Sequence, residues 1–160
     1  MSNHLIRFTA EEVLAILRGD KTVTRQVVKC GDKPGDWPEV PSPYGKPGDT
    51  LWVQETFVLE NTSDYHGDQI VPPGTPVQKH DDEPDGEFDA GPYWLIPHYR
   101  ATEPDAAIYE HGEDHTRWSP SVHMRRWMSR ITVVNADVEV QKINGIWYWV
   151  GVFELKGGVR

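Results

Sequence analysis

Cationic and hydroxyl side chains gather in one short run near the N-terminus, Leu17-Arg18-Gly19-Asp20-Lys21-Thr22-Val23-Thr24-Arg25. Lys21 and Arg25 can contact phosphate or carbonyl oxygens, and the hydroxyls of Thr22 and Thr24 can donate or accept hydrogen bonds. Side chains of these types at this spacing are typical of a site that holds an anion or a carbonyl group. The alternative is a solvated lysine at an ordinary tight turn.

A second group of such residues lies between positions 118 and 130. Arginines at 125, 126 and 130 are interleaved there with two tryptophans, which gives the set Trp118, Arg125, Arg126, Trp127 and Arg130. Guanidinium groups pair with phosphate oxygens and indole rings stack on bases, so this mixture suits single-stranded nucleic acid or a nucleotide. The structural alternative is that arginine stacks on tryptophan and fixes the loop.

Other constellations in the chain are less complete. His111 and His115 are four residues apart and would share one face of a helix, but no third ligand is placed by spacing, so we predict no metal site. His123 is close in sequence to Ser119 and Ser121, as a base is to a nucleophile, yet no strained nucleophile turn precedes them. Neither standard glycine spacing for a phosphate loop occurs, and we predict no cofactor.

The elements that position the first cluster follow from local patterns. Thr9 and Glu12 form a capping-box pair, and an apolar stripe at helical spacing follows them. Gly19 suits the left-handed position that ends a helix. The segment 22–28 alternates and is rich in β-branched residues, so it predicts a strand. Lys21 therefore stands where a helix ends and a strand begins.

Further strands are predicted along the chain, and the segment 118–130 is predicted to be a short helix or an ordered loop. Asn144-Gly145 is a strong hairpin signal, and Pro97 marks an edge or a bulge. The expected strands cover residues 4–8, 50–58, 93–100, 131–140 with a break at 135–136, and 146–155. This order favours an α+β, mainly β fold: a small β-barrel of about five to six strands with one packed N-terminal helix and long loops.

Charge is unevenly distributed along the 160 residues, whose net charge is −9. Between Glu60 and Asp114 there are 14 acidic residues against Lys79 and Arg100, while the rest of the chain has 14 basic and 11 acidic residues. We predict a single domain over 1–160 with an acidic surface insert at about 60–90, where apolar periodicity is lost. Such an insert could screen a basic face or mimic a phosphate backbone for a protein partner.

Cysteine usage and hydropathy place the protein in a broad class. Cys30 is the only cysteine, so neither an internal disulfide nor a thiolate zinc cage is expected. No apolar run approaches the ~18 residues that span a membrane, and no signal peptide opens the chain. We expect a cytoplasmic protein without membrane partners. The sequence gives no indication of the oligomeric state.

Three motifs in this order resemble those of ASCH domains, which belong to the PUA-like superfamily. The first is Gly-x-Lys-Thr-x-Thr-Arg at 19–25, and the second is Pro-Gly-Asp-x-Leu-Trp-Val-x-Glu at 47–55. The third is the 118–131 stretch with the tryptophan-rich last strand, which resembles a phage and prophage branch. The resemblance covers most of the chain outside about 60–90. It implies a PUA-like β-barrel whose cleft is lined by the Lys-Thr-x-Thr strand and binds RNA, single-stranded nucleic acid or a modified nucleoside.

The resemblance also implies two enzymatic alternatives. One bacterial branch resembles hydrolases that deacylate N4-acetylcytidine with a lysine, a threonine and a glutamate, and another member has been linked to ribonuclease action. Lys21 and Thr24 match the lysine and threonine. The family glutamate lies on a helical segment before the last strand, where this chain has a hairpin at 143–146. Glu55 is therefore the remaining candidate for the third catalytic residue.

Overall fold

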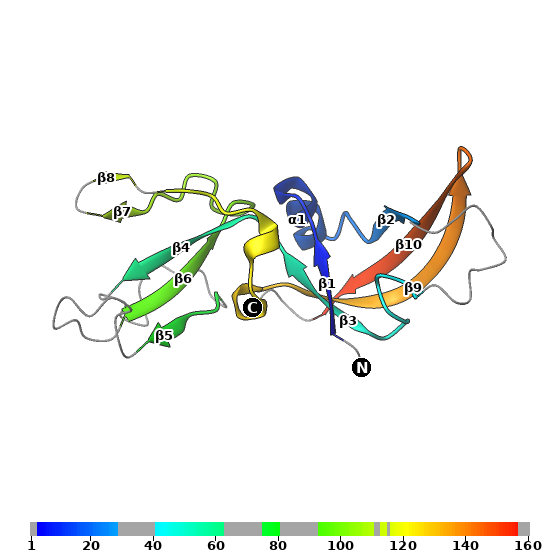
Figure 1. Ribbon diagram of the computed structural model, residues 1–160, viewed down its shortest axis with the longest axis horizontal. Helices are drawn as coiled ribbons and strands as arrows, with labels where there is room; N and C mark the ends of the chain where they lie inside the picture. The colour runs from blue at the N-terminus through cyan, green and yellow to red at the C-terminus, as the bar shows by residue number, and fades with distance from the viewer. Residues whose placement is uncertain are drawn as a thin grey trace. The chain divides into compact units, whose positions relative to one another are not determined.

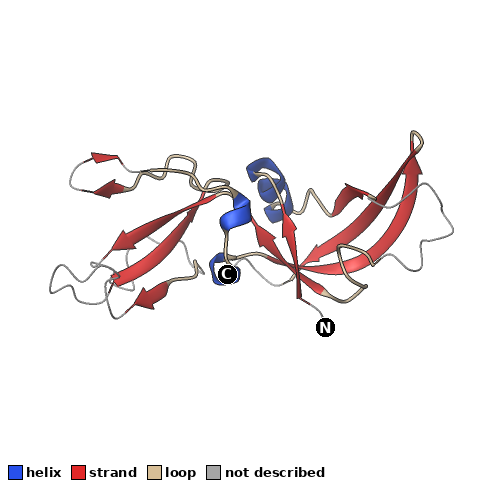
Figure 2. Ribbon diagram, viewed as in Figure 1, coloured by secondary structure: helices blue, strands red, loops and turns tan. Residues whose placement is uncertain are grey.

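The computed structural model describes residues 3–28, 41–62, 75–80, 93–110, 113–114 and 116–156 (Figure 1). Within these ranges the fold is mainly β with one α-helix, which confirms the predicted class (Figure 2). The described strands form open sheets of five, three and two strands, so the predicted closed barrel is not found among them. The elements are β1 (Asn3–Arg7), α1 (Ala10–Leu17), β2 (Val23–Val27), β3 (Thr50–Gln54), β4 (Phe57–Thr62), β5 (Gln78–His80), β6 (Tyr93–Tyr99), β7 (Tyr109–Glu110), β8 (Glu113–Asp114), η2 (Ser121–His123), η3 (Arg126–Met128), β9 (Thr132–Ile143) and β10 (Ile146–Leu155).

The chain divides into two compact units, and each is built from separate segments. The first unit contains Met1–Ile6, Ala15–Val53 and Ile131–Gly158. The second unit contains Arg7–Leu14 and Gln54–Arg130, with the last two residues of the chain. The five-stranded sheet lies essentially in the first unit, and the two smaller sheets lie in the second.

Helix α1 begins and ends as its sequence predicts. The Thr9 amide donates to Oε2 of Glu12 at 2.9 Å, and the Glu12 amide donates to Oγ1 of Thr9 at 3.3 Å, which completes the capping box. Gly19 follows the helix with φ of +80°, a conformation that glycine adopts without a Cβ clash. The Lys21 amide then donates to the Ala15 carbonyl at 3.1 Å, so the helix end fixes the backbone from which β2 starts.

The five-stranded sheet has the order β1-β3-β9-β10-β2. Its longest pair is the β9–β10 hairpin, drawn in orange and red in Figure 1. Asn144 and Gly145 both have positive φ, 49° and 84°, as a two-residue hairpin turn of the predicted type requires. The predicted break at 135–136 is a bulge within one continuous strand, because the register shifts opposite Val152 and Phe153.

Tyr44 packs on one face of this sheet, over Gly151. Its ring packs edge-on against Phe153, with centroids 5.5 Å apart and planes at 86°. The side-chain amide of Asn135 donates to the Tyr44 carbonyl at 3.0 Å and holds the tyrosine in place. A Cβ at Gly151 would lie 2.7 Å from both aromatic rings, so the residue opposite Thr24 in β2 has to be glycine.

The strand predicted over 50–58 is divided between the two units. Strand β3 pairs with β9, whereas β4 pairs with β6 in a three-stranded sheet of order β4-β6-β5. Between β3 and β4, Glu55 is buried and charged, and Phe57 exchanges two backbone hydrogen bonds with Ser119. The alternation of apolar residues could not reveal this break, because Val53, Phe57 and Val58 are buried on both sides of it.

Pro97 lies within β6, in the part of this strand that pairs with β4. Its partner in β4 is Leu59, while β5 pairs only with residues 93–95 of β6. Among the described residues, β6 therefore has one neighbour at the proline. This position is a local sheet edge, as predicted, where the missing N–H interrupts no second ladder.

Part of the predicted acidic insert belongs to this sheet. Residues 60–62 end β4, and β5 comes from residues 78–80. The remainder of 60–90 lies outside the described residues, except for 75–77.

Replacing Gly151 with alanine should destabilise the protein. The added methyl group meets Tyr44 and Phe153 at 2.7 Å, so one ring must shift, and overpacking of this kind costs about 1–3 kcal/mol. Urea unfolding would measure the loss. Ala136→Ser, which adds one atom at an exposed position of β9, should stay within about 0.5 kcal/mol of the wild type. Equal stabilities for Gly151→Ala and the wild type would show that the aromatic contact is loose.

Candidate functional site

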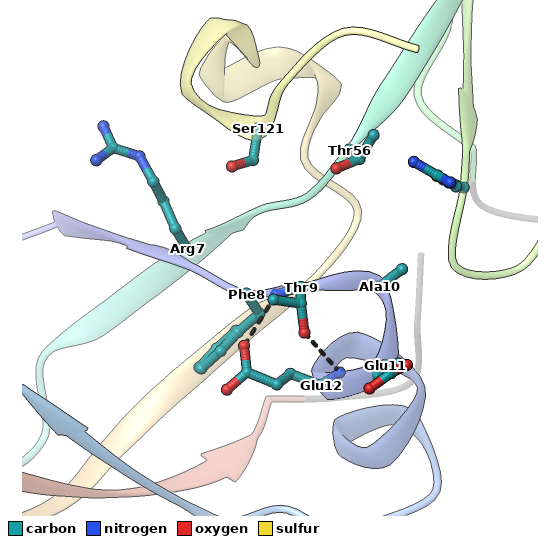
Figure 3. A pocket seen from close by; sticks show the side chains of 9 residues that line it. Arg7, Phe8, Thr9, Ala10, Glu11, Glu12, Thr56 and Ser121 are labelled. Carbon is teal, nitrogen blue, oxygen red and sulfur yellow. Dashed lines mark hydrogen bonds between the residues drawn. The ribbon is translucent and has the colours of Figure 1, made fainter.

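The second unit contains a pocket of about 640 Å³ beside the start of α1 (Figure 3). Pockets that hold small molecules commonly have volumes of about 300–1,000 Å³. Strand β1, the first turn of α1, the β3–β4 connection, the end of β6 and η2 all contribute to its wall. The lining residues are Arg7, Phe8, Thr9, Ala10, Glu11, Glu12, Thr56, Arg100 and Ser121.

Arg7 is held in its position by a buried glutamine. Nε of Arg7 donates to Oε1 of Gln54 at 2.8 Å, and Nε2 of Gln54 donates to the Met124 carbonyl at 2.9 Å. Gln54 is only 4% exposed, so its amide orientation is fixed from both sides. The terminal nitrogens of the exposed guanidinium group are not used by this contact, and they retain N–H groups that can bind an acceptor.

The other polar groups of the pocket come from several elements. Arg100 is exposed at the end of β6, and its amide donates to the Thr56 carbonyl at 3.0 Å. Figure 3 shows Arg7, Thr56 and Ser121 around the space in front of the first turn of α1. Glu11 and Glu12 bring negative charge to the same wall, and Glu12 is bonded to Thr9 in the capping box. The pocket therefore combines two cations, three hydroxyls and two carboxylates.

The arginine-rich segment predicted at 118–130 is ordered and supplies part of this wall. It contains the two short 3₁₀ helices η2 and η3, and Ser121 of η2 lines the pocket. Arg125 and Arg126 are exposed, whereas Trp118 and Trp127 are half-buried. The segment thus carries exposed cations and half-buried tryptophans, and it reaches the pocket through Ser121. Neither Arg7 nor Arg100 was singled out by the sequence, because each is far from other lysines and arginines along the chain.

Arg130 and Glu55 form a buried ion pair in the same unit. Nε of Arg130 donates to Oε1 of Glu55, and Nη2 donates to Oε2, both at 3.0 Å. Nη1 donates to Thr102 at 2.9 Å, and the guanidinium carbon lies 4.0 Å from the centre of the Tyr99 ring. The side chains of Arg130 and Glu55 are 6% and 1% exposed. Both candidate site residues are therefore committed to each other in the interior, where neither lines the pocket.

Burial raises the pKa of Glu55 above its ordinary value, and the hydrogen bonds and positive charge of Arg130 oppose this rise. Tyr99 completes the cluster, since its hydroxyl donates to the Met128 carbonyl at 2.6 Å. His98 lies beside it in β6 between two carboxylates, 2.7 Å from Oε2 of Glu60 and 3.1 Å from Oε1 of Glu103. These contacts bind β4, β6 and the 118–130 segment into one unit.

The cluster around Lys21 lies in the first unit, at the edge strand β2. Thr24 lies opposite Gly151, and its hydroxyl is hydrogen-bonded to the hydroxyl of Tyr44. Burial raises the pKa of Tyr44 to about 12, and the bond to Thr24 opposes the rise. Lys21 is half-buried, while Thr22 and Arg25 are exposed. Since Arg25 neighbours Thr24 in the strand, their side chains lie on opposite faces of the sheet.

The remaining candidates are only partly described. Residues 30, 111 and 115 lie outside the described residues, whereas His123 is exposed at the end of η2. No group of three acidic, histidine or cysteine residues in the described ranges could hold a metal ion. Among the same residues, no helix is long and apolar enough to cross a membrane.

Comparison with known proteins gives no relative: no family model, curated protein or solved structure matches this chain.

Removing the cation of the buried pair should destabilise the protein in a pH-dependent way. In Arg130→Met the Glu55 carboxylate stays buried without a partner, which costs about 3–5 kcal/mol at neutral pH. Without Arg130, burial raises the pKa of Glu55 further above 4.5. Between 4.5 and the raised pKa only the folded variant holds the proton, so its free energy of unfolding should fall as the pH increases through that window.

Urea unfolding at mildly acidic and mildly alkaline pH would measure this slope. The double variant Arg130→Met/Glu55→Gln is the matched control for Arg130→Met. It has the same methionine at position 130, and its glutamine has the size of glutamate but no titrating group. Its stability should depend less steeply on pH than that of Arg130→Met. Parallel profiles for the two variants would mean that Glu55 is not the group responsible.

Proposed function

We propose that the protein binds single-stranded nucleic acid, RNA or a modified nucleoside through the second unit, where the pocket and the exposed arginines at 125 and 126 lie. The observation that carries this proposal is that one wall of the pocket comes from the arginine-rich segment itself, through Ser121. Arg7 and Arg100 face the same space from two other elements. A ligand in the pocket would thus contact the segment that carries the further cations and the tryptophans.

The residue types fit the two requirements of single-strand binding. Arginine forks bind phosphate oxygens in pairs, and Arg125 and Arg126 are exposed to solvent for such contacts. Trp118 and Trp127 are half-buried, and indole rings are the side chains on which bases stack most favourably. Arg130 and Glu55 support this surface from inside, since their charges are satisfied by each other.

The cluster at β2 is a separate candidate group for phosphate contacts, and it lies in the first unit. Lys21, Thr22 and Arg25 offer two cations and one exposed hydroxyl, and Thr24 supports that strand through Tyr44. Because the whole chain carries a net charge of −9, attraction of a polyanion must come from local groups of cations. Such attraction acts at short range and is strongly screened by salt.

Neutralising Arg125 and Arg126 together should weaken nucleic-acid binding. When a phosphate contact is lost, binding releases fewer counterions from the nucleic acid. The double variant Arg125→Gln/Arg126→Gln should therefore bind a labelled single strand more weakly. The slope of log affinity against log salt should also become shallower, by about 0.7 for each lost contact. Lys156→Gln, which removes an exposed cation from the first unit, is the charge control. Fluorescence anisotropy at low and moderate salt measures both quantities. Identical slopes for all three proteins would contradict the proposed surface.

Hydrolysis of N4-acetylcytidine is the enzymatic alternative, and we expect no turnover. The carboxylate of Glu55 accepts both of its hydrogen bonds from Arg130 and is 1% exposed, so it is poorly placed to exchange a proton with a substrate. The hydroxyl of Thr24 is bonded to Tyr44. Incubation with N4-acetylcytidine and chromatographic analysis for cytidine tests this. Turnover that disappears in Lys21→Ala would establish the amidohydrolase instead.

A further inference from the structure

We propose that the pocket beside the start of α1 receives the phosphorylated end of a strand, that is, a terminal nucleotide with a phosphomonoester. This inference rests on the proposed function and specifies the ligand of the same site. Neither Arg7 nor Arg100 belongs to the cationic clusters evident in the sequence, yet both line this one pocket.

The arginines are suited to a phosphate group at a fixed position. Arg7 is oriented by Gln54, which is itself held by the Met124 carbonyl, so little side-chain freedom is lost when its terminal nitrogens bind an oxygen. The backbone amide of Arg100 is hydrogen-bonded to the carbonyl of Thr56, so the backbone of Arg100 is held at a fixed distance from that of Thr56. Two guanidinium groups and the hydroxyls of Thr56 and Ser121 supply more donors than a single phosphate oxygen can accept.

The charge of the pocket favours a strand end over an internal linkage. An internal phosphodiester carries one negative charge on two free oxygens, whereas a terminal monoester carries about −1.5 to −2 on three oxygens. Glu11 and Glu12 lie on the same wall and repel any anion. A ligand with concentrated charge and a third oxygen gains more from two arginines, so it overcomes this repulsion better than a diester does.

The carboxylates also suit the rest of a terminal nucleotide. A sugar carries hydroxyl donors and a base carries amino donors, and ionised carboxylates only accept hydrogen bonds. Glu11 is exposed in the first turn of α1 and is therefore available for such donors. A volume of about 640 Å³ gives room for more than the phosphate alone.

The test compares one oligonucleotide sequence in three forms: with a 5′-phosphate, with a 3′-phosphate, and with hydroxyl groups at both ends. At moderate salt, one phosphorylated form should bind about tenfold more tightly than the hydroxyl form, as expected for added charge-assisted hydrogen bonds. The two phosphorylated strands distinguish which end enters the pocket. Arg100→Gln and Arg7→Gln should each remove the preference, because each should weaken the phosphorylated form by a much larger factor than the hydroxyl form.

Arg125→Gln is the matched control, because it removes an exposed arginine of the same unit that does not line the pocket. It should weaken all three strands by a similar factor and keep the preference. Equal affinities of the wild-type protein for all three forms would overturn the inference and leave the proposed function intact. If none of the three binds to folded protein at low salt, the proposed function fails, and the inference fails with it.

Discussion

The ion pair between Glu55 and Arg130 is the contact on which the second unit depends. Its partners are 75 positions apart, and they stand at the beginning and the end of the long segment 54–130 of that unit. A buried ion pair contributes little net stability compared with apolar side chains, but losing one partner is expensive. The pair therefore favours one arrangement of this segment, in which its two ends are bonded to each other and Arg130 packs on the ring of Tyr99.

The pocket is built from residues adjacent to this interior cluster. Gln54 precedes Glu55 and orients Arg7, while Thr56 follows Glu55 and lines the wall. Arg100 follows Tyr99 in the same way. The residues that follow the two buried members, Thr56 after Glu55 and Arg100 after Tyr99, therefore reach the pocket, while Gln54 stays buried and orients Arg7. The same backbone arrangement therefore pairs Glu55 with Arg130 in the interior and places Arg7 and Arg100 at the pocket.

Local signals in the sequence predict local structure well. The capping box of α1, the glycine after it and the Asn-Gly turn were all predicted, because a few adjacent residues determine each of them. The split of the 50–58 strand and the role of Arg130 depend on partners far away in sequence, which periodicity does not indicate. The pocket shows the same limit, since Arg7 and Arg100 become neighbours of one space only through the fold.

The pairing of β3 with β9 has a consequence for how such a chain can change over generations. The amide of Val53 donates to the carbonyl of Ile131 at 3.0 Å, so the chain leaves and re-enters the first unit at adjacent points. In thermodynamic terms the two strands are a hairpin with a very long loop, and closing such a loop costs only about 0.6 kcal/mol more for each doubling of its length. A lineage can therefore lengthen, shorten or exchange the material between these points with little effect on strand pairing. We expect this position to be where diversity accumulates, while the Asn135 and Tyr44 contacts that close the sheet tolerate little change.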